Sequence, residues 1–457
     1  MLIFRAALLV WFAGIAFSQD TLALRALRYL TALIRIDTSN PPGNETRTAE
    51  YLKGVAGAEG IPCELVGGDP ARQNFIARLS GSGGVRPLLL MAHSDVVPAE
   101  TGRWAVPPFS AGVRELFLYG RGALDDKSLL AAELAVLVEL KRTRRPLSRD
   151  VILLAEADEE GGSTGIRWLA SNAWKKIAAE FALNEGGFAV ELPSGTRVYQ
   201  IQTAEKVPTP VLVRARGMAG HGSLPRPDNP VVRVARALVK LADSDQPVRL
   251  NSSTRIYFAE LSKLPDYAWL APLIAHLEST TDRVSAANEI RDRDPELNAQ
   301  LRTTISADVI HAGKVVNVIP SIAEAQVDVR RLPNETAEEV LARLRKIVHD
   351  SEVEIAPLPG HVMPATEPSS LSTPLYKAME AVLQQTASRS VVIPYMQRGG
   401  TDGAFLRQRG MAVYGVPLFM REDRENRAHG IDERISVANL ETGTNLLWTI
   451  VTRVAGK

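Results

Sequence analysis

Short runs of apolar residues alternate with longer segments of helical periodicity through most of the chain. Residues 22–34 repeat leucine and isoleucine at the spacing of one helix face, and a Leu/Ala-rich helix is expected over 126–144, with Asp126 as its N-cap. Strands are expected at 86–92, 151–155 and 181–183, because each contains a short, uninterrupted apolar run, which is typical of buried strands. This order of elements predicts an α/β fold.

Acidic and histidine residues gather where the expected strands end. Open α/β sheets bind their ligands beyond the carboxyl ends of the strands, and these residue types in that place indicate a metal site. The residues are His93 and Asp95 after the first run, Glu159 and Glu160 after the second, Glu185 after the third, and Asp125 between a glycine turn and the long helix.

Each residue type suits a particular task at a metal site. His93 and Asp95 are two apart at a strand end, so both side chains point to the same side, and Asp95 can hold the ring nitrogen of His93 that does not bind the metal. A carboxylate such as Asp125 can bridge two cations, which a neutral imidazole cannot. Of the adjacent acids Glu159 and Glu160, one can bind a metal while its neighbour takes a proton from the attacking water.

The same stretch allows a second chemistry. Residues 161–165 match G-x-S-x-G between a strand and a helix, which is the context of a serine nucleophile at Ser163. A serine hydrolase also needs an acid and a histidine, and Asp402 and His429 are available later in the chain. This alternative leaves His93 and the acidic clusters without a role.

Composition narrows the class of protein. A chain of 457 residues predicts two or three domains, and 45% hydrophobic with 23% charged residues is ordinary for a globular enzyme. The formal net charge of +1 gives no basic footprint for nucleic acid and no electrostatic attraction to a membrane surface. The single cysteine, Cys63, excludes an intrachain disulfide and a multi-cysteine zinc site.

The N-terminus predicts export. Arg5 precedes an apolar run from Ala6 to Phe17, and small residues follow at the spacing that a signal peptidase reads. A spanning helix needs roughly 20 apolar residues, so this run is short for an anchor. We expect residues 1–18 to be a signal peptide and the mature protein to be secreted or periplasmic. The alternative is a membrane anchor formed by the uncleaved segment.

Four motifs in order resemble one known family: H-S-D at 93–95, G-R-G-A-L-D-D-K at 120–127, D-E-E-G-G at 158–162 and N-E-G at 184–186. The sequence is similar to the dinuclear-zinc exopeptidases and aminoacylases, which include acetylornithine deacetylase and succinyl-diaminopimelate desuccinylase. It looks closest to the branch of carboxypeptidase S and the N-acyl-amino-acid hydrolases. The family usually has aspartate where this chain has Asn184; since Glu185 is intact, we expect ligation to be kept.

The resemblance implies an α/β catalytic domain formed by residues 19–205 and 361–457, with a mixed sheet and helices on both faces. A smaller α+β lid, residues 206–360, would be inserted into it. The lid carries a helical insertion at 245–300, which could line an acyl pocket, replace a lid-dimer contact or serve ordinary packing.

The resemblance also implies the site and its cofactors. Two Zn²⁺ per subunit, for which Co²⁺ or Mn²⁺ could substitute, would be bound by His93 and Glu185 on one ion, Glu160 and His429 on the other, and Asp125 between them. Glu159 would be the general base, Asp95 would orient His93, and Glu433 would support the second ion. The peptide bond after Asp125 would be cis.

Further residues would contact the substrate. His221 and Asn317 would stabilise the oxyanion, while Arg330 and the loop of Gly400 and Thr401 would hold a free carboxylate. The expected reaction is hydrolysis of an amide bond next to that carboxylate, in a C-terminal peptide bond or an N-acyl amino acid. The expected partners are this small substrate and a second copy of the chain bound through the lid, with no nucleic acid and no membrane span after cleavage. A non-catalytic binding protein on the same fold would lack ligands or base, and all are present.

Overall fold

The structure is a computed structural model that describes residues 20–360, 363–422 and 426–457. The expected signal peptide at 1–18 lies outside the described residues. Within the described part of the chain, no helix is both long enough and apolar enough to cross a bilayer.

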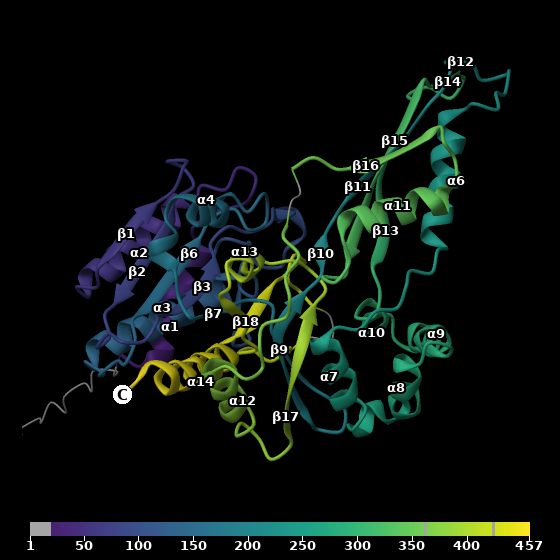
Figure 1. The fold of residues 1–457 in the computed structure, drawn as a ribbon. Helices are drawn as coiled ribbons and strands as arrows, with labels where there is room; N and C mark the ends of the chain where they lie inside the picture. The colour runs from purple at the N-terminus through teal and green to yellow at the C-terminus, as the bar shows by residue number, and fades with distance from the viewer. Residues whose placement is uncertain (1–19, 361–362, 423–425) are drawn as a thin grey trace, which may run out of the picture.

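A nine-stranded sheet forms the centre of the larger domain (Figure 1). β3 pairs in parallel with both β6 and β7, β7 with β18, and β9 with β17. β1 with β2, β2 with β6, β8 with β9 and β18 with β9 are antiparallel, so the sheet is mixed as predicted. The strands in spatial order are β1 (Cys63–Val66), β2 (Asn74–Leu79), β6 (Val151–Glu156), β3 (Leu88–His93), β7 (Phe181–Asn184), β18 (Ala412–Gly415), β9 (Arg197–Glu205) and β17 (Ser390–Gln397), with β8 (Phe188–Glu191) beside β9.

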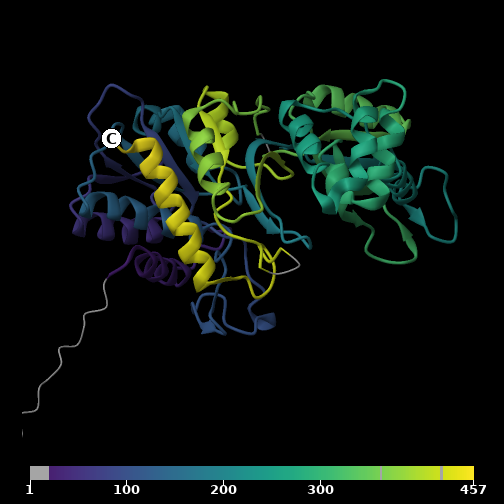
Figure 2. The same ribbon diagram turned by 90° about the horizontal axis from the view of Figure 1, so that it is seen from below.

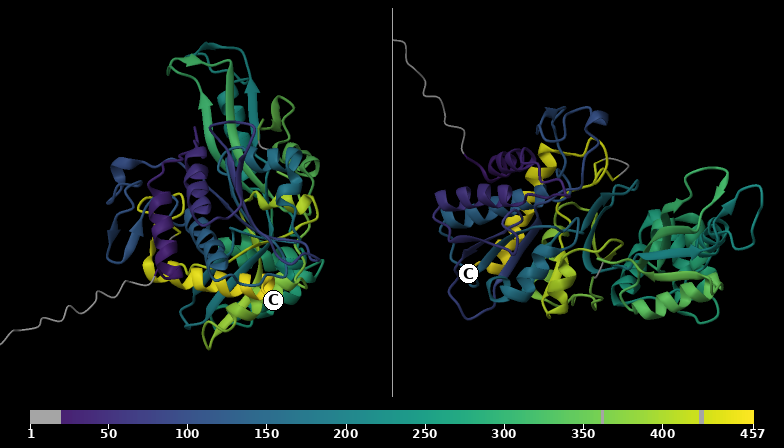
Figure 3. Two further views of the ribbon diagram at one scale, coloured as in Figure 1. Left: turned by 90° about the vertical axis from the view of Figure 1, so that its left-hand side faces the viewer. Right: turned by 90° about the horizontal axis from the view of Figure 1, so that it is seen from above.

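Helices cover both faces of this sheet, because the central strands are apolar on both sides. Leu88 and Leu90 of β3 pack into one core cluster, while Leu89 and Met91 pack into another on the opposite face. The first face carries α1 (Leu22–Ile34), α2 (Thr46–Ala58), α3 (Lys127–Arg142), α12 (Pro374–Leu383) and α14 (Val437–Ala455), and the second carries α4 (Thr164–Asn172), α5 (Trp174–Ile177) and α13 (Gly403–Gln408). Figure 3 shows α1, α3 and α14 gathered on their face. The predicted fold class is confirmed.

A second, antiparallel sheet lies to one side of the first (Figure 2). It consists of β10 (Val207–Pro208), β11 (Val211–Arg216), β13 (Thr304–Ala312), β15 (Ile322–Arg331) and β16 (Val353–Pro357). The helices α6 (Pro230–Ala242) and α11 (Ala337–Val348) share a core cluster with this sheet. The short strands β12 (Gly220–His221) and β14 (Val318–Ile319) pair at its far end (Figure 1).

The helical insertion packs against the larger domain although its sequence lies between strands of the second. It comprises α7 (Ser252–Leu261), η2 (Pro265–Leu270), α8 (Ala271–Glu278), α9 (Arg283–Arg293) and α10 (Pro295–Ala299). Phe258 and Leu261 of α7 belong to the same apolar cluster as Ile393 and Tyr395 of β17. The insertion therefore buries its apolar face on the edge of the nine-stranded sheet.

Short connecting elements complete the described chain. A three-stranded sheet of β4 (Val113–Arg114), β5 (Phe117–Tyr119) and β19 (Arg434–Ser436) joins the segment before Asp125 to the C-terminal part of the chain, and η1 (Thr101–Arg103) precedes it. This pairing brings the residues near 120 close to those near 433, although more than three hundred positions separate them in the sequence.

Candidate metal centre

The ends of three neighbouring parallel strands carry the residues predicted to form the site. His93 is the last residue of β3, Glu159 and Glu160 follow β6, and Glu185 follows β7 directly. Because β6, β3 and β7 are adjacent and parallel, their carboxyl ends meet at one edge of the sheet. Asp125 reaches the same edge from the loop before α3.

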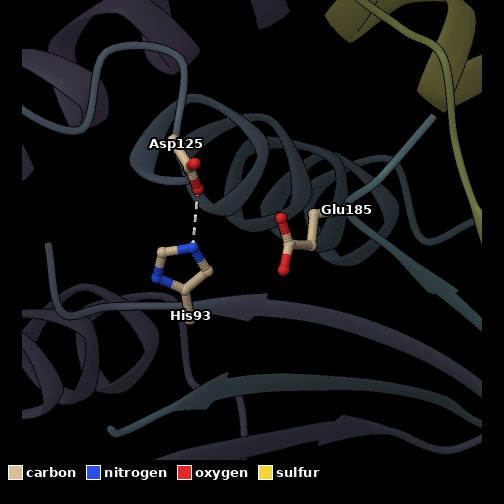
Figure 4. Close-up of side chains that lie close together, drawn as sticks. All are labelled: His93, Asp125 and Glu185. Carbon is tan, nitrogen blue, oxygen red and sulfur yellow. Dashed lines mark hydrogen bonds and ion pairs between the residues drawn. The ribbon is translucent and has the colours of Figure 1, made fainter. Parts of the chain in front are cut away.

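The structure brings the five predicted ligands together in two groups that share Asp125. His93 Nε2 lies 2.9 Å from Asp125 Oδ1, and Glu185 completes this first group (Figure 4). His429 Nε2 lies 3.1 Å from Asp125 Oδ2 and 3.0 Å from Glu160 Oε1. In each group one potential ligand atom per residue lies within 4.8 Å of the others. The two oxygens of Asp125 thus face one group each.

The electrostatics of this cluster fit a pair of divalent cations. Burial, with the negative charge of Asp125 beside it, raises the pKa of Glu185 to about 8. Burial also raises the pKa of Glu159 far above its usual value, and Glu185 adds to this rise. Hydrogen bonds to Asp125 and Glu160 raise the pKa of His429 to about 10. Burial and the repulsion between neighbouring carboxylates disfavour the ionised form of these groups. Cations bound between them would offset that repulsion.

Asp95 lies against both His93 and the Glu159–Glu160 segment. The ring atom His93 Nδ1 lies 2.9 Å from the main-chain carbonyl oxygen of Asp95, but 3.7 Å from its carboxylate. The buried carboxylate instead accepts the backbone N–H groups of Glu159 and Glu160, each at 3.1 Å. It also accepts the side-chain amide of Asn40 at 2.8 Å. The side chain of Asp95 therefore holds the Glu159–Glu160 segment, and its backbone orients His93.

Glu433 supports the loop that presents Asp125. Its buried carboxylate accepts the backbone N–H groups of Gly122, Leu124 and Asp125 at 3.1, 2.7 and 3.1 Å. It also pairs with the guanidinium of Arg121 at 2.7 Å. The peptide bond between Asp125 and Asp126 is cis, as the resemblance implies.

The expected role of Asp126 is wrong in one respect. Asp126 occupies the N-cap position of α3, but its side chain makes no capping hydrogen bond. Its backbone φ of −132° and ψ of 21° differ from the extended conformation of a usual N-cap. The carboxyl is buried instead, and burial raises its pKa well above the usual value.

Asn40 was not predicted from the sequence. Its amide nitrogen donates to Asp95 and to Asp158, both at 2.8 Å, across 55 and 118 positions of the chain. The local sequence of residues 37–43 predicts only a break between two helices. Nothing in it indicates that the side chain of Asn40 reaches the strand ends. The long sequence separation is the reason why it was missed.

Comparison with known proteins now decides the family, because the sequence profile of Peptidase family M20/M25/M40 matches residues 89–453. The chain belongs to this peptidase family. A human relative, N-fatty-acyl-amino acid synthase/hydrolase PM20D1, is 30% identical over 379 residues, which cover 80% of this chain and 74% of the relative. The predicted resemblance is therefore confirmed, and the chain is an enzyme of the M20 metallohydrolase kind.

Solved structures of the M20 family share the fold. The M20 family metallo-carboxypeptidase Sso-CP2 of Sulfolobus solfataricus has a TM-score of 0.71 and 21% identity, with 94% of this chain and 98% of that chain covered. The YXEP protein of Bacillus subtilis, a dinuclear metal-binding peptidase from the M20 family, has a TM-score of 0.57 and 13% identity, with 94% and 97% covered. In the structure of this chain, the described residues offer two groups of potential metal ligands, and both groups include Asp125.

Two residues expected at the M20 site lie away from the strand ends. His221 and Asn317 belong to the β12–β14 region, which Figure 1 shows at the far end of the second domain. The Nδ1 atom of the exposed His221 lies 2.7 Å from Ser223 Oγ, and the carbonyl of Asn317 accepts the N–H of Gly222 at 2.8 Å. Within one chain, neither belongs to the two ligand groups.

The residues expected to bind the substrate carboxylate have partners of their own. Arg330 Nε donates to both carboxylate oxygens of Asp328, at 2.9 and 2.8 Å. The buried hydroxyl of Thr401 donates to Glu205 at 2.7 Å. Gly400 packs closely, since a Cβ placed there would lie 2.9 Å from Pro208 Cδ.

A cavity of about 370 Å³ opens beside the metal centre, with Asp125 and Glu185 in its wall. The helical insertion supplies part of the remaining wall, and the larger domain supplies the rest. Apolar and aromatic residues prominent in the lining are Phe188, Tyr257, Tyr267, Leu297, Tyr395 and Phe419. The side chains of the insertion thus serve two of the roles considered for it, since they pack against the larger domain and also line a pocket next to the ligand groups.

Proposed function

We propose that this M20 enzyme hydrolyses N-acyl amino acids at the amide bond next to their free carboxylate. The observation that carries the proposal is the pair of ligand groups sharing Asp125, beside a cavity whose lining combines aromatic and apolar side chains with polar ones. The human relative acts on N-fatty-acyl amino acids, as its name states, which supports an acyl group as one part of the substrate. A C-terminal peptide bond is the second candidate, supported by the fold shared with a metallo-carboxypeptidase.

We propose zinc as the native metal, two ions per subunit, with Co²⁺ or Mn²⁺ as substitutes. His93, Asp125 and Glu185 would hold one ion, and Asp125, Glu160 and His429 the other. Imidazole nitrogen and carboxylate oxygen are ligands that catalytic zinc uses. When bound, the ions would polarise the scissile carbonyl and make the attacking water more acidic.

Glu159 is the proposed general base. It follows β6 next to the ligand Glu160, and Asp95 fixes the backbone N–H of both residues. Its burial and its acidic neighbours raise its pKa, which makes its carboxylate a stronger base. In the ionised form, which cations bound beside it would favour, Glu159 can accept a proton from the attacking water and then return it to the departing amine. These two transfers require no other acid or base.

Replacing Glu159 by glutamine tests the proposal. The expected result is a loss of turnover of at least about 100-fold, because general base catalysis contributes about 10²–10⁴ in rate. Zinc content should stay at the wild-type level, since Glu160 and the other ligands are kept. Turnover of N-acyl amino acids and dipeptides, with and without chelator, is measured together with metal content, and Glu100→Gln on the exposed surface is the matched control. Retained activity in Glu159→Gln refutes the base assignment.

We further propose that a second copy of the chain supplies His221 and Asn317. Several apolar side chains around them are exposed, including Met218 at 62%, Leu224 at 70% and Val316 at 101%. Such a patch favours a protein interface, and homodimers are the commonest symmetric assembly. Each second domain would then act as a lid on the site of the other subunit.

Mixing two inactive variants tests this arrangement. His221→Ala and Glu159→Gln are each expected to be inactive, and mixed dimers contain one site that combines an intact Glu159 with an intact His221. An equal mixture with random exchange should therefore regain about a quarter of wild-type activity, because half of the dimers are mixed and each has one intact site of two. No recovery after verified subunit exchange means that His221 acts within its own chain.

Residues 1–18 are proposed to be a signal peptide that directs the enzyme to the periplasm or the outside. The apolar run of residues 6–17 and the small residues after it support this proposal. Expression of the full chain in a bacterium with a periplasm, followed by N-terminal sequencing of the product, tests it. A product that retains residues 1–18 in the membrane fraction favours the anchor instead.

A further inference from the structure

Arg398 lines the same cavity as the metal ligands Asp125 and Glu185. It directly follows Gln397, the last residue of β17, and precedes the glycines of the 399–403 loop. Its Nη1 atom lies 2.8 Å from Glu296 Oε2 on α10 of the helical insertion, and the exposed fractions of the two side chains are 36% and 67%. A partly buried cation is thus paired, across the cavity wall, to an acid that faces solvent.

The surroundings of Arg398 suit an anion. The rings of Tyr257 and Tyr395 are buried, with centroids 5.8 Å apart, and Phe188 meets Tyr395 edge to face at 5.5 Å. Burial raises the pKa of both tyrosines, so their hydroxyl groups stay neutral and can donate hydrogen bonds. A guanidinium beside low-dielectric aromatic rings attracts an anion more strongly than one in bulk water.

Other arginines near the site donate hydrogen bonds to groups within the chain. Arg434 Nη1 donates to Tyr119 Oη at 2.8 Å, and Arg427 Nη1 donates to the carbonyl of Ile431 at 3.3 Å. Arg330 is engaged by Asp328 on the second domain. Arg398 differs because the carboxylate of its ion-pair partner Glu296 is exposed enough to be replaced by another carboxylate at little cost.

We propose that Arg398 binds the free carboxylate of the substrate and so makes the enzyme selective for acids over the corresponding amides. The planar guanidinium can bind both oxygens of a carboxylate at once. On binding, the substrate carboxylate takes the place of Glu296, and the scissile amide extends from there toward Asp125 and Glu185. This assignment rests on the proposed function, and it adds a specificity residue three positions before Thr401, whose hydroxyl is already bonded to Glu205.

Matched substrates separate this role from a general effect on activity. kcat and KM are measured for an N-acyl amino acid and for its C-terminal carboxamide, with the zinc-loaded wild type, Arg398→Ala and Arg398→Lys. Arg398→Ala should lower kcat/KM for the acid about 10- to 100-fold, mainly through KM, because a hydrogen bond to a charged group contributes about 1.5–3 kcal/mol. The carboxamide should be unaffected, and Arg398→Lys should fall between wild type and alanine for the acid. Arg409→Ala, whose guanidinium lies over the ring of Trp174, is the control for loss of one positive charge.

Binding provides a readout that does not depend on turnover. The acid is titrated calorimetrically into Glu159→Gln and into Glu159→Gln/Arg398→Ala. Its Kd should be about 10- to 100-fold higher for the double variant, because the hydrogen bond to a charged group is lost. Equal losses for acid and carboxamide, or no loss for the acid, overturn the assignment. If the wild type cleaves neither compound, the proposed function fails, while the titration still decides whether Arg398 binds the carboxylate.

Discussion

Replacing Asp95 by asparagine separates two possible roles of this residue. In the structure its Oδ1 accepts the N–H of Glu159, while its Oδ2 accepts both the N–H of Glu160 and the amide of Asn40. An asparagine side chain has one acceptor oxygen in place of two. The new amide nitrogen should take the Oδ1 position, because this leaves one N–H group unpaired instead of two donors. The group left unpaired belongs to the proposed base, Glu159.

The magnitude follows from that single lost acceptor. A buried donor without a partner costs about 1–3 kcal/mol, which corresponds to about a 5- to 150-fold change when it is felt in the transition state. We therefore expect Asp95→Asn to lower kcat by roughly 10- to 100-fold and to lower the free energy of unfolding by about 1–3 kcal/mol. The contact of His93 Nδ1 with the backbone carbonyl at position 95 is kept, so the zinc content should not change.

Steady-state kinetics, metal content and denaturant unfolding are measured on the same preparations. Asp37→Asn, an exposed aspartate whose side chain accepts from Ser39, is the matched control and should leave all three quantities unchanged. If excess zinc restores full activity to Asp95→Asn, the carboxylate orients the metal ligand His93, and the reasoning from the Glu159 contact is refuted. An unchanged kcat refutes it as well.

Two further predictions concern stability and the rejected chemistry. Burial lowers the pKa of Lys206 to about 7. Between pH 7 and the usual lysine pKa of about 10.4, the unfolded chain therefore binds more protons than the folded one. The free energy of unfolding of the wild type should thus rise with pH over this range, by at most about 5 kcal/mol. Denaturant unfolding from pH 7 to 10 should show a flatter rise for Lys206→Met, and parallel curves would contradict the assignment. Ser163→Ala should keep most of its activity while a chelator abolishes it, because the side chain of Ser163 is largely buried and follows the proposed metal ligand Glu160. The opposite pattern would favour the serine hydrolase.

Much of the fold and part of the site could be predicted because the signals are local. The runs before His93, Glu160 and Glu185 are continuously apolar, so each identifies a buried strand and the polar residue at its end. Parallel pairing then brings these ends to one edge of the sheet. For His429 the metal role came only from the family resemblance, since no apolar run ends directly before it.

The sequence by itself determined which residue types stand at the strand ends, since hydrophobic periodicity and short motifs depend on neighbours within about ten positions. Only the tertiary structure decided that the carboxylate of Asp95 accepts the backbone N–H of Glu159, and that Asn40 joins it across 55 positions. It likewise decided that the helical insertion packs on the larger domain and brings Glu296 to Arg398. Such contacts depend on how separate elements pack, and hydrogen bonds between distant side chains have no period along the chain from which they could be predicted.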